Sequence, residues 1–82
     1  MEREAFVSDV DRVAIFERDG WICQLCGRPT DRAAQVPDRR APTIDHIVPL
    51  AAGGTHEPDN VQCAHYSCNS AKGARIIKKT VA

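Results

Sequence analysis

The sequence has few aromatic residues and no long apolar run. Its 82 residues include two phenylalanines, one tryptophan and one tyrosine. A chain this short buries little apolar surface, so its core alone gives only marginal stability. No apolar stretch is long enough for a membrane span or a signal peptide, and the first residues are charged. We therefore expect one intracellular domain that needs a disulfide, a metal or a partner to stabilise it.

The chain also lacks net charge, with 11 basic and 11 acidic residues, so its composition does not by itself indicate nucleic-acid binding. The charges are unevenly placed, because acidic residues predominate in residues 1–20 and none follows Asp59. A basic terminal segment on a neutral chain can meet phosphates locally, although a solvated helix face has the same pattern. The basic residues of that segment are Lys72, Arg75, Lys78 and Lys79.

What the chain does have is four cysteines. Cys23 and Cys26 form a C-x-x-C pair followed by Gly27, and glycine lets the backbone bend so that both sulfurs face one ion. Nothing in the sequence indicates an oxidising compartment, and paired cysteines of a reduced chain favour a metal site over disulfides. A structural zinc ion takes four Cys or His ligands, so a second pair is needed.

The candidates for that second pair are Cys63, His65 and Cys68. His65-x-x-Cys68 repeats the two-residue gap of the first pair, and that gap lets both side chains reach one ion. We predict a structural zinc site whose ligands are Cys23, Cys26, His65 and Cys68. Cys63 would then be a small buried residue beside the site. A pair of Cys63 with Cys68 and a plain core histidine at position 65 are the alternatives.

Local patterns predict a few short elements joined by long connections. Apolar residues at helical spacing follow Ser8, a candidate N-cap. β-branched residues lie between Pro42 and Pro49, and turn-forming residues occupy the connecting stretches. The expected elements are a helix from the N-cap Ser8 to Asp19-Gly20, a loop over 28–42, a strand over 43–48, a short return strand over 61–63, and a helix from Ser67 to about Lys79.

The segment around Asp45-His46 carries residues suited to phosphodiester hydrolysis. Histidine is the natural general base near neutral pH, and a hard divalent ion on oxygen ligands neutralises phosphate charge. Asn60 lies where the connection returns, so its amide can hydrogen-bond the backbone across the gap. Asn69 directly follows Cys68, and its amide oxygen can join the Asp45 carboxylate on one ion.

The final helix also predicts a phosphate-binding stripe. At about 100° per residue, Lys72, Arg75 and Lys79 share one side of that helix, with Asn69 at its edge. A basic stripe beside a hard-metal site suits a scissile phosphate and its neighbours.

Taken together, the order and spacing of these residues resemble the HNH endonucleases, most closely the small zinc-stapled members of bacteria and phages. The resemblance covers about residues 12–75. It implies a small zinc-stabilised α+β fold with an N-terminal helix and a ββα-metal core. It also implies a single nuclease domain over 1–82, with its core at about 12–79. The matching segments are 23–27, 44–50, 53–55, 59–62 and 68–73.

The resemblance implies roles as well. His46 is the expected general base, Asn60 the residue that holds the loop, and Asp45 with Asn69 the ligands of a catalytic ion. The family often has histidine where Asn69 stands, and asparagine there favours harder ions such as Mg²⁺ or Mn²⁺. His65 stands where cysteine is usual, and histidine is an acceptable zinc ligand.

These observations predict a metal-dependent DNA endonuclease, a phosphodiester hydrolase with a structural Zn²⁺ and a catalytic divalent cation. Its substrate is expected to be double-stranded DNA in the cytoplasm of a bacterial or phage-infected cell, with sequence choice modest or supplied by a protein partner. The alternative is a non-catalytic zinc-bound nucleic-acid-binding module with the same fold. A thiol redox module is disfavoured, because the C-x-x-C lacks a βαβ context.

Overall fold

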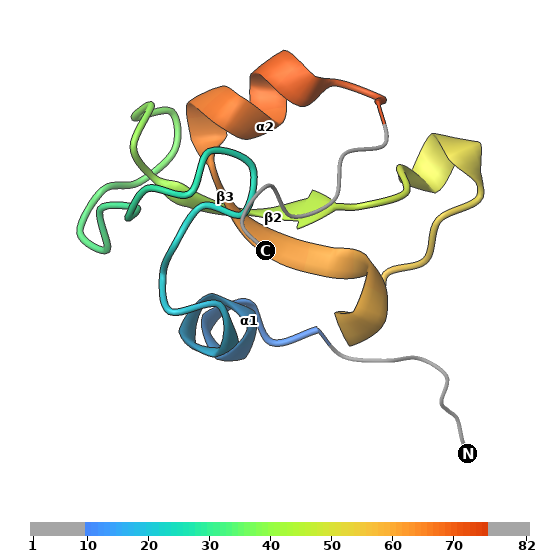
Figure 1. Cartoon of the computed structure of the whole chain (residues 1–82), viewed down its shortest axis with the longest axis horizontal. Coiled ribbons are helices and arrows are strands. Elements are labelled where there is room, and N and C mark those ends of the chain that lie inside the picture. The colour runs from blue at the N-terminus through green and yellow to red at the C-terminus, as the bar shows by residue number, and fades with distance from the viewer. Residues whose placement is uncertain (1–9, 76–82) are drawn as a thin grey trace.

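In the computed structural model, which describes residues 10–75, a two-stranded hairpin lies between two short helices (Figure 1). Two single-turn 3-10 helices interrupt the long connection between the strands. The elements are α1 (Arg12–Arg18), β2 (Pro42–His46), η1 (Leu50–Ala52), η2 (Pro58–Asn60), β3 (Val61–His65) and α2 (Tyr66–Lys72).

The hairpin is antiparallel, and its register places Asp45 opposite Gln62 and Ile44 opposite Cys63. Successive strand residues face opposite sides. The face of β2 that bears Thr43 and Asp45 is buried, because α2 packs on it. β3 is buried along nearly its whole length, so the hairpin forms the centre of the domain.

Helix α1 begins at Arg12 with Asp11 as its N-cap. The Asp11 carboxylate accepts hydrogen bonds from the backbone N–H groups of Val13 at 3.1 Å and Ala14 at 3.4 Å. The predicted helix start at Ser8 is wrong, because residues 10 and 11 are not helical and Asp11 is the N-cap, although Ser8 itself lies outside the described residues. The helix ends before Gly20, whose φ of 66° is left-handed, as the sequence predicts for a glycine that terminates a helix.

Side chains at the end of α1 attach it to β3. The Arg18 guanidinium donates hydrogen bonds to the carbonyls of Pro58 at 2.9 Å and Val61 at 2.7 Å. The Asp19 carboxylate accepts one from the Cys63 N–H at 2.9 Å. The apolar core is small, as expected for this length, and consists of Ile15, Phe16, Cys23, Ala41, Val61, Cys63 and Ala64.

Other element boundaries also differ from those predicted, and β2 ends at His46, two residues before the end of the strand predicted over 43–48. β3 extends to His65, two residues further than the expected return strand. Helix α2 ends at Lys72 because Gly73 adopts a φ of 58° and its N–H closes the last turn on the Asn69 carbonyl. The predicted continuation of the helix through Arg75 is therefore wrong, and its part beyond residue 75 lies outside the described residues.

The loop expected over 28–42 contains neither helix nor strand before β2 begins at Pro42. A single antiparallel bridge pairs Ile22 with Pro29 at its start, and Asp31 and Arg40 are joined by a backbone hydrogen bond near its end. Of the helices within residues 10–75, none is long and apolar enough to cross a membrane.

Candidate metal and active site

The fold brings together four side chains with metal-ligating atoms. The ligand atoms of Cys23, Cys26, His65 and Cys68 all lie within 4.8 Å of one another. Cys23 and Cys26 come from the knuckle after α1, where Gly27 has a φ of 81° and donates its N–H to the Cys23 carbonyl. β3 and the first turn of α2 supply the other two. We call these four residues the Cys-His group.

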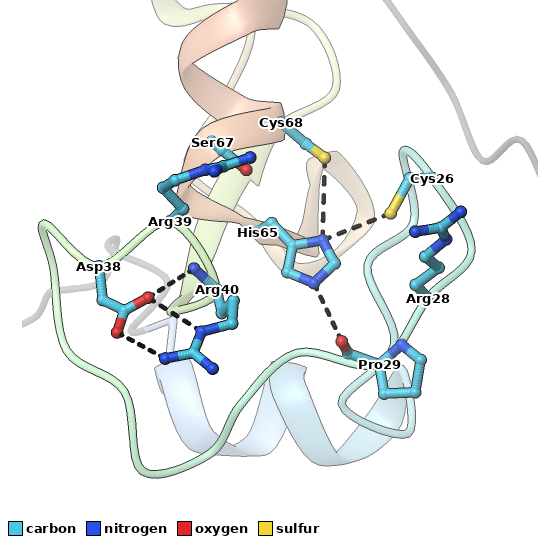
Figure 2. Close-up of a pocket in the computed structure, with 9 residues that line it drawn as sticks. All are labelled: Cys26, Arg28, Pro29, Asp38, Arg39, Arg40, His65, Ser67 and Cys68. Carbon is cyan, nitrogen blue, oxygen red and sulfur yellow. Dashed lines mark hydrogen bonds and ion pairs between the residues drawn. The ribbon is translucent and has the colours of Figure 1, made fainter.

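The imidazole of His65 is oriented for metal binding (Figure 2). Its Nε2 lies 2.9 Å from the Pro29 carbonyl oxygen, so Nε2 carries the proton and donates it to that carbonyl. Nδ1 is then the free acceptor, and it lies 3.3 Å from Cys26 Sγ and 3.8 Å from Cys68 Sγ. A carbonyl that accepts the ring N–H in this way sets the tautomer of metal-bound histidines.

The Cys23 and Cys68 thiols of the Cys-His group differ in pKa. Burial would raise the pKa of Cys23, but backbone N–H groups of His65 and Cys26 outweigh it and lower that pKa. Burial and the charge of Cys23 raise the pKa of Cys68 to about 12. Several sulfurs packed together resist deprotonation until a dication compensates their charge. The donor set and its spacing fit a zinc ion.

Cys63 lies outside this group. It is fully buried, and burial raises the pKa of its thiol to about 12. A protonated thiol in the core is a small apolar side chain. Among the described residues, the geometry therefore selects His65 rather than Cys63, which is the ligand set that the two-residue gap predicts.

A second cluster lies where β2 ends. Asp45 is 2% exposed, and each oxygen of its carboxylate has a partner. Oδ1 accepts a hydrogen bond from Lys72 Nζ at 2.7 Å, and Oδ2 accepts one from Gln62 Nε2 at 2.8 Å. Lys72 also donates to the carbonyls of His46 and Ile47. Helix α2 thus fixes both the carboxylate and the backbone of the Asp45-His46 segment.

Beside this cluster, His46 pairs with a residue that the sequence analysis did not identify. His46 Nε2 lies 2.9 Å from His56 Nδ1, with the ring centroids 5.1 Å apart. Burial lowers the pKa of His46 below 6.5, and the charges of His56 and Lys72 lower it further, while Asp45 acts in the opposite direction. His46 is therefore neutral at pH 7, as a general base must be.

The connection between the strands is held by Asn60. Its amide oxygen accepts the Val48 N–H at 2.9 Å, and its amide nitrogen donates to the carbonyls of Val48 at 2.9 Å and Thr55 at 2.8 Å. Gly54 packs so closely against the Val48 carbonyl that a Cβ at this position would overlap it. These contacts determine the path of the loop that carries His56 to His46.

Asn69 faces the same side of β2 as Asp45. Its amide nitrogen donates to Thr43 Oγ1 and to the Ile44 carbonyl, both at 3.1 Å. The Thr43 hydroxyl gives its own proton to the Ala64 carbonyl, so Thr43 must accept from Asn69, which assigns the amide orientation. The amide nitrogen of Asn69 is thus hydrogen-bonded to β2, and its amide oxygen is the atom that could bind a cation.

The predicted basic stripe is not present in this form. Lys72 is 2% exposed and pairs with Asp45, so its ammonium is not displayed to a phosphate. Arg75 follows the end of α2 and donates to the carbonyls of Lys72 at 3.1 Å and Ala71 at 3.0 Å, which caps the helix. Lys79 lies outside the described residues. The prediction assumed a helix that continues past Gly73, whereas α2 ends at Lys72.

Asp45 and Asn69 nevertheless carry ligand atoms of the type expected for a hard cation. A carboxylate and an amide oxygen are the ligand types that Mg²⁺ and Mn²⁺ prefer, and a carboxylate oxygen has lone pairs beyond the one that Lys72 engages. Asp45 and Asn69 therefore fit such an ion chemically, although an ion at Asp45 would share the carboxylate with an ammonium.

These features define a class of small α+β domain built on a hairpin and the helix that follows it. The Cys-His group lies at one end of the hairpin, and Asp45 with His46, here called the Asp-His pair, lies at the other. In agreement with this, a family model for the HNH endonuclease matches residues 23–75, which is more than half of the chain. The chain belongs to the HNH endonuclease family. A search of curated proteins finds no match to it.

Proposed function

We propose that this protein is a metal-dependent endonuclease that hydrolyses phosphodiester bonds of double-stranded DNA inside a bacterial or phage-infected cell, with His46 as the general base. The observation that carries the proposal is the His46–His56 hydrogen bond at 2.9 Å. It orients the ring of a neutral histidine at the end of β2, and the preceding residue carries a carboxylate that would suit a hard cation. Binding of nucleic acid alone requires none of these groups.

In the proposed reaction, His46 keeps its proton on Nε2 and donates a hydrogen bond from it to His56 Nδ1, so that Nδ1 of His46 is free to accept a proton. A water molecule transfers a proton to that Nδ1 as its oxygen attacks phosphorus. The bond from phosphorus to the leaving oxygen breaks, and that oxygen is protonated from solvent. Throughout, Asn60 holds the loop and Lys72 holds the backbone of the Asp45-His46 segment.

We assign Asp45 and Asn69 as the residues that would hold a divalent cation, Mg²⁺ or Mn²⁺, which would neutralise charge on the phosphate when bound. A zinc ion in the Cys-His group would be structural, because four protein ligands leave no open position. Cys68 and Asn69 are neighbours, so loss of zinc would also displace a ligand of the second ion. Sequence choice would be modest or supplied by a protein partner.

The Asp45–Lys72 ion pair supports the alternative of a non-catalytic nucleic-acid-binding module, because the ammonium already compensates the carboxylate. Nicking of supercoiled plasmid at increasing Mg²⁺ or Mn²⁺ separates the two proposals. The endonuclease requires cleavage that saturates with the ion and weakens in Asn69→Ala with its zinc retained. Equal, negligible cleavage by both proteins at every ion concentration would leave the binding module.

A further inference from the structure

A hollow of about 740 Å³ lies beside the Cys-His group (Figure 2), and neither Asp45 nor His46 lines it. Cys26, His65 and Cys68 form one wall. Arg28 lies on one side of His65, and Arg39 and Arg40 lie on the other, in the loop that precedes β2. We call it the arginine hollow. Nothing in the proposed chemistry uses these three arginines.

Most other cations of the described chain already have partners. The guanidinium of Arg12 stacks on Phe16 at 5.7 Å, and that of Arg32 stacks on Trp21 at 4.7 Å. As described above, Arg18 and Arg75 donate to backbone carbonyls, and Lys72 is buried against Asp45.

The arginines that line the arginine hollow have fewer partners. Arg40 pairs with Asp38 at 3.3 Å. Arg28 and Arg39 are exposed, and neither guanidinium has a hydrogen bond, ion pair or ring contact among residues 10–75. They are therefore the two cations of the described chain that remain available to a ligand, and both line one hollow.

The net positive charge of the lining favours an anionic ligand. Three guanidiniums face one carboxylate, and a zinc ion on three thiolates and a neutral imidazole would add one negative charge, so the lining stays net positive. A guanidinium presents a planar fork that matches the paired oxygens of a phosphate. An open hollow with two such forks suits a phosphate on an extended chain better than a compact ligand.

The hollow is also placed at a useful distance from His46. His65, which lines the hollow, pairs with Pro42 at the start of β2, and His46 is the last residue of β2. At about 3.3 Å per residue, a five-residue strand spans roughly 13 Å. That length corresponds to about four base pairs, since each strand of a duplex carries one phosphate per about 3.4 Å.

We propose that the arginine hollow binds the phosphodiester backbone of double-stranded DNA to one side of the cleaved bond, through Arg28 and Arg39. The proposal rests on the proposed function for its ligand, and it supplies the phosphate contacts that the buried Lys72 does not. These contacts position DNA and carry no sequence information.

The test is the salt dependence of duplex binding, measured by fluorescence anisotropy on the full chain carrying His46→Ala, so that no cleavage intervenes. Arg28→Gln with Arg39→Gln is compared with Arg12→Gln with Arg32→Gln, which removes the same charge from arginines stacked on aromatic rings. Arg28→Lys with Arg39→Lys keeps the charge. Zinc content is measured for each protein.

We expect Arg28→Gln with Arg39→Gln to reduce the magnitude of the negative slope of log K against log salt by about 2, since each phosphate contact contributes about 0.9. The control pair and the lysine pair should leave the slope close to that of the parent. An unchanged slope in the first pair, or an equal fall in the control, would overturn the arginine hollow while leaving the endonuclease intact. No binding by the parent at any salt concentration would overturn both proposals. Preferential binding of polyglutamate at the same arginines would assign the hollow to acidic protein instead.

Discussion

Lys72 Nζ and Asp45 Oδ1 form an ion pair of 2.7 Å in which both side chains are almost completely buried, at 1% and 2% exposure. The pair joins α2 to the end of β2, beside the proposed base. Lys72 therefore acts as a support for the Asp45-His46 segment, and any ion bound by Asp45 must accommodate its ammonium.

Removing one partner of this pair should destabilise the domain strongly. Lys72→Met leaves a buried carboxylate without its counter-charge, a change that typically costs about 3–5 kcal/mol. The measurement is urea unfolding of the zinc-loaded protein. Lys72→Met with Asp45→Asn should recover much of the loss, since neither charge is then unpaired. If Lys72→Met unfolds at the same urea concentration as the parent, the pair does not support the fold.

His56 should affect turnover more than substrate affinity. His56→Ala removes the acceptor that orients His46 Nε2, so kcat should fall on the order of tenfold, less than the roughly 10²–10⁴-fold that a general base contributes. KM and zinc content should stay unchanged. His56→Gln, which retains an acceptor, should recover part of the rate, and Glu57→Gln serves as the neighbouring control. A loss confined to KM would show that His56 binds DNA instead.

The pH dependence of cleavage should report the lowered pKa of His46. Burial, then the charge of His56, lowers this pKa below 6.5, and only the neutral imidazole accepts a proton. The value of kcat/KM should therefore be flat near pH 7 and fall on acidification, with its midpoint below pH 6.5. His46→Ala should show no such midpoint in any residual activity. A midpoint above pH 6.5 would contradict the assigned environment.

The Cys-His group predicts a metal dependence of folding. Metal analysis should find one tightly bound zinc, and a strong chelator should unfold the reduced domain, since metal-binding energy is folding energy in such sites. His65→Ala should lose zinc, whereas Cys63→Ser should keep it. Zinc retained in His65→Ala and lost in Cys63→Ser would show that the ligand set is wrong.

The parts of the site that depend on local spacing could be predicted from the sequence. Two gaps of two residues place Cys23 with Cys26 and His65 with Cys68, because a short gap limits where the side chains can go. The hydrogen bonds of Asn60 follow in the same way from its position at the end of a loop. The HNH family was accordingly identified from the order of these residues.

The remainder depends on contacts between distant segments. A glycine inside a predicted helix costs stability relative to alanine, whereas the positive φ of Gly73 ends α2 altogether. The burial of Lys72 depends on how α2 packs across β2, and a single helix does not encode that. His56 lies in a turn-rich segment with no periodicity, and its contact with His46 exists only because Asn60 and Gly54 determine the loop path.

The central claim is that His46 is the general base of a phosphodiester hydrolase. The most direct measurement is the rate of plasmid nicking in Mg²⁺ by the wild-type protein and by His46→Ala, with duplex binding and zinc content measured on the same samples. We predict that His46→Ala binds DNA and zinc as the wild type does and loses cleavage by at least about 10²-fold. Equal cleavage rates in the two proteins would contradict the account.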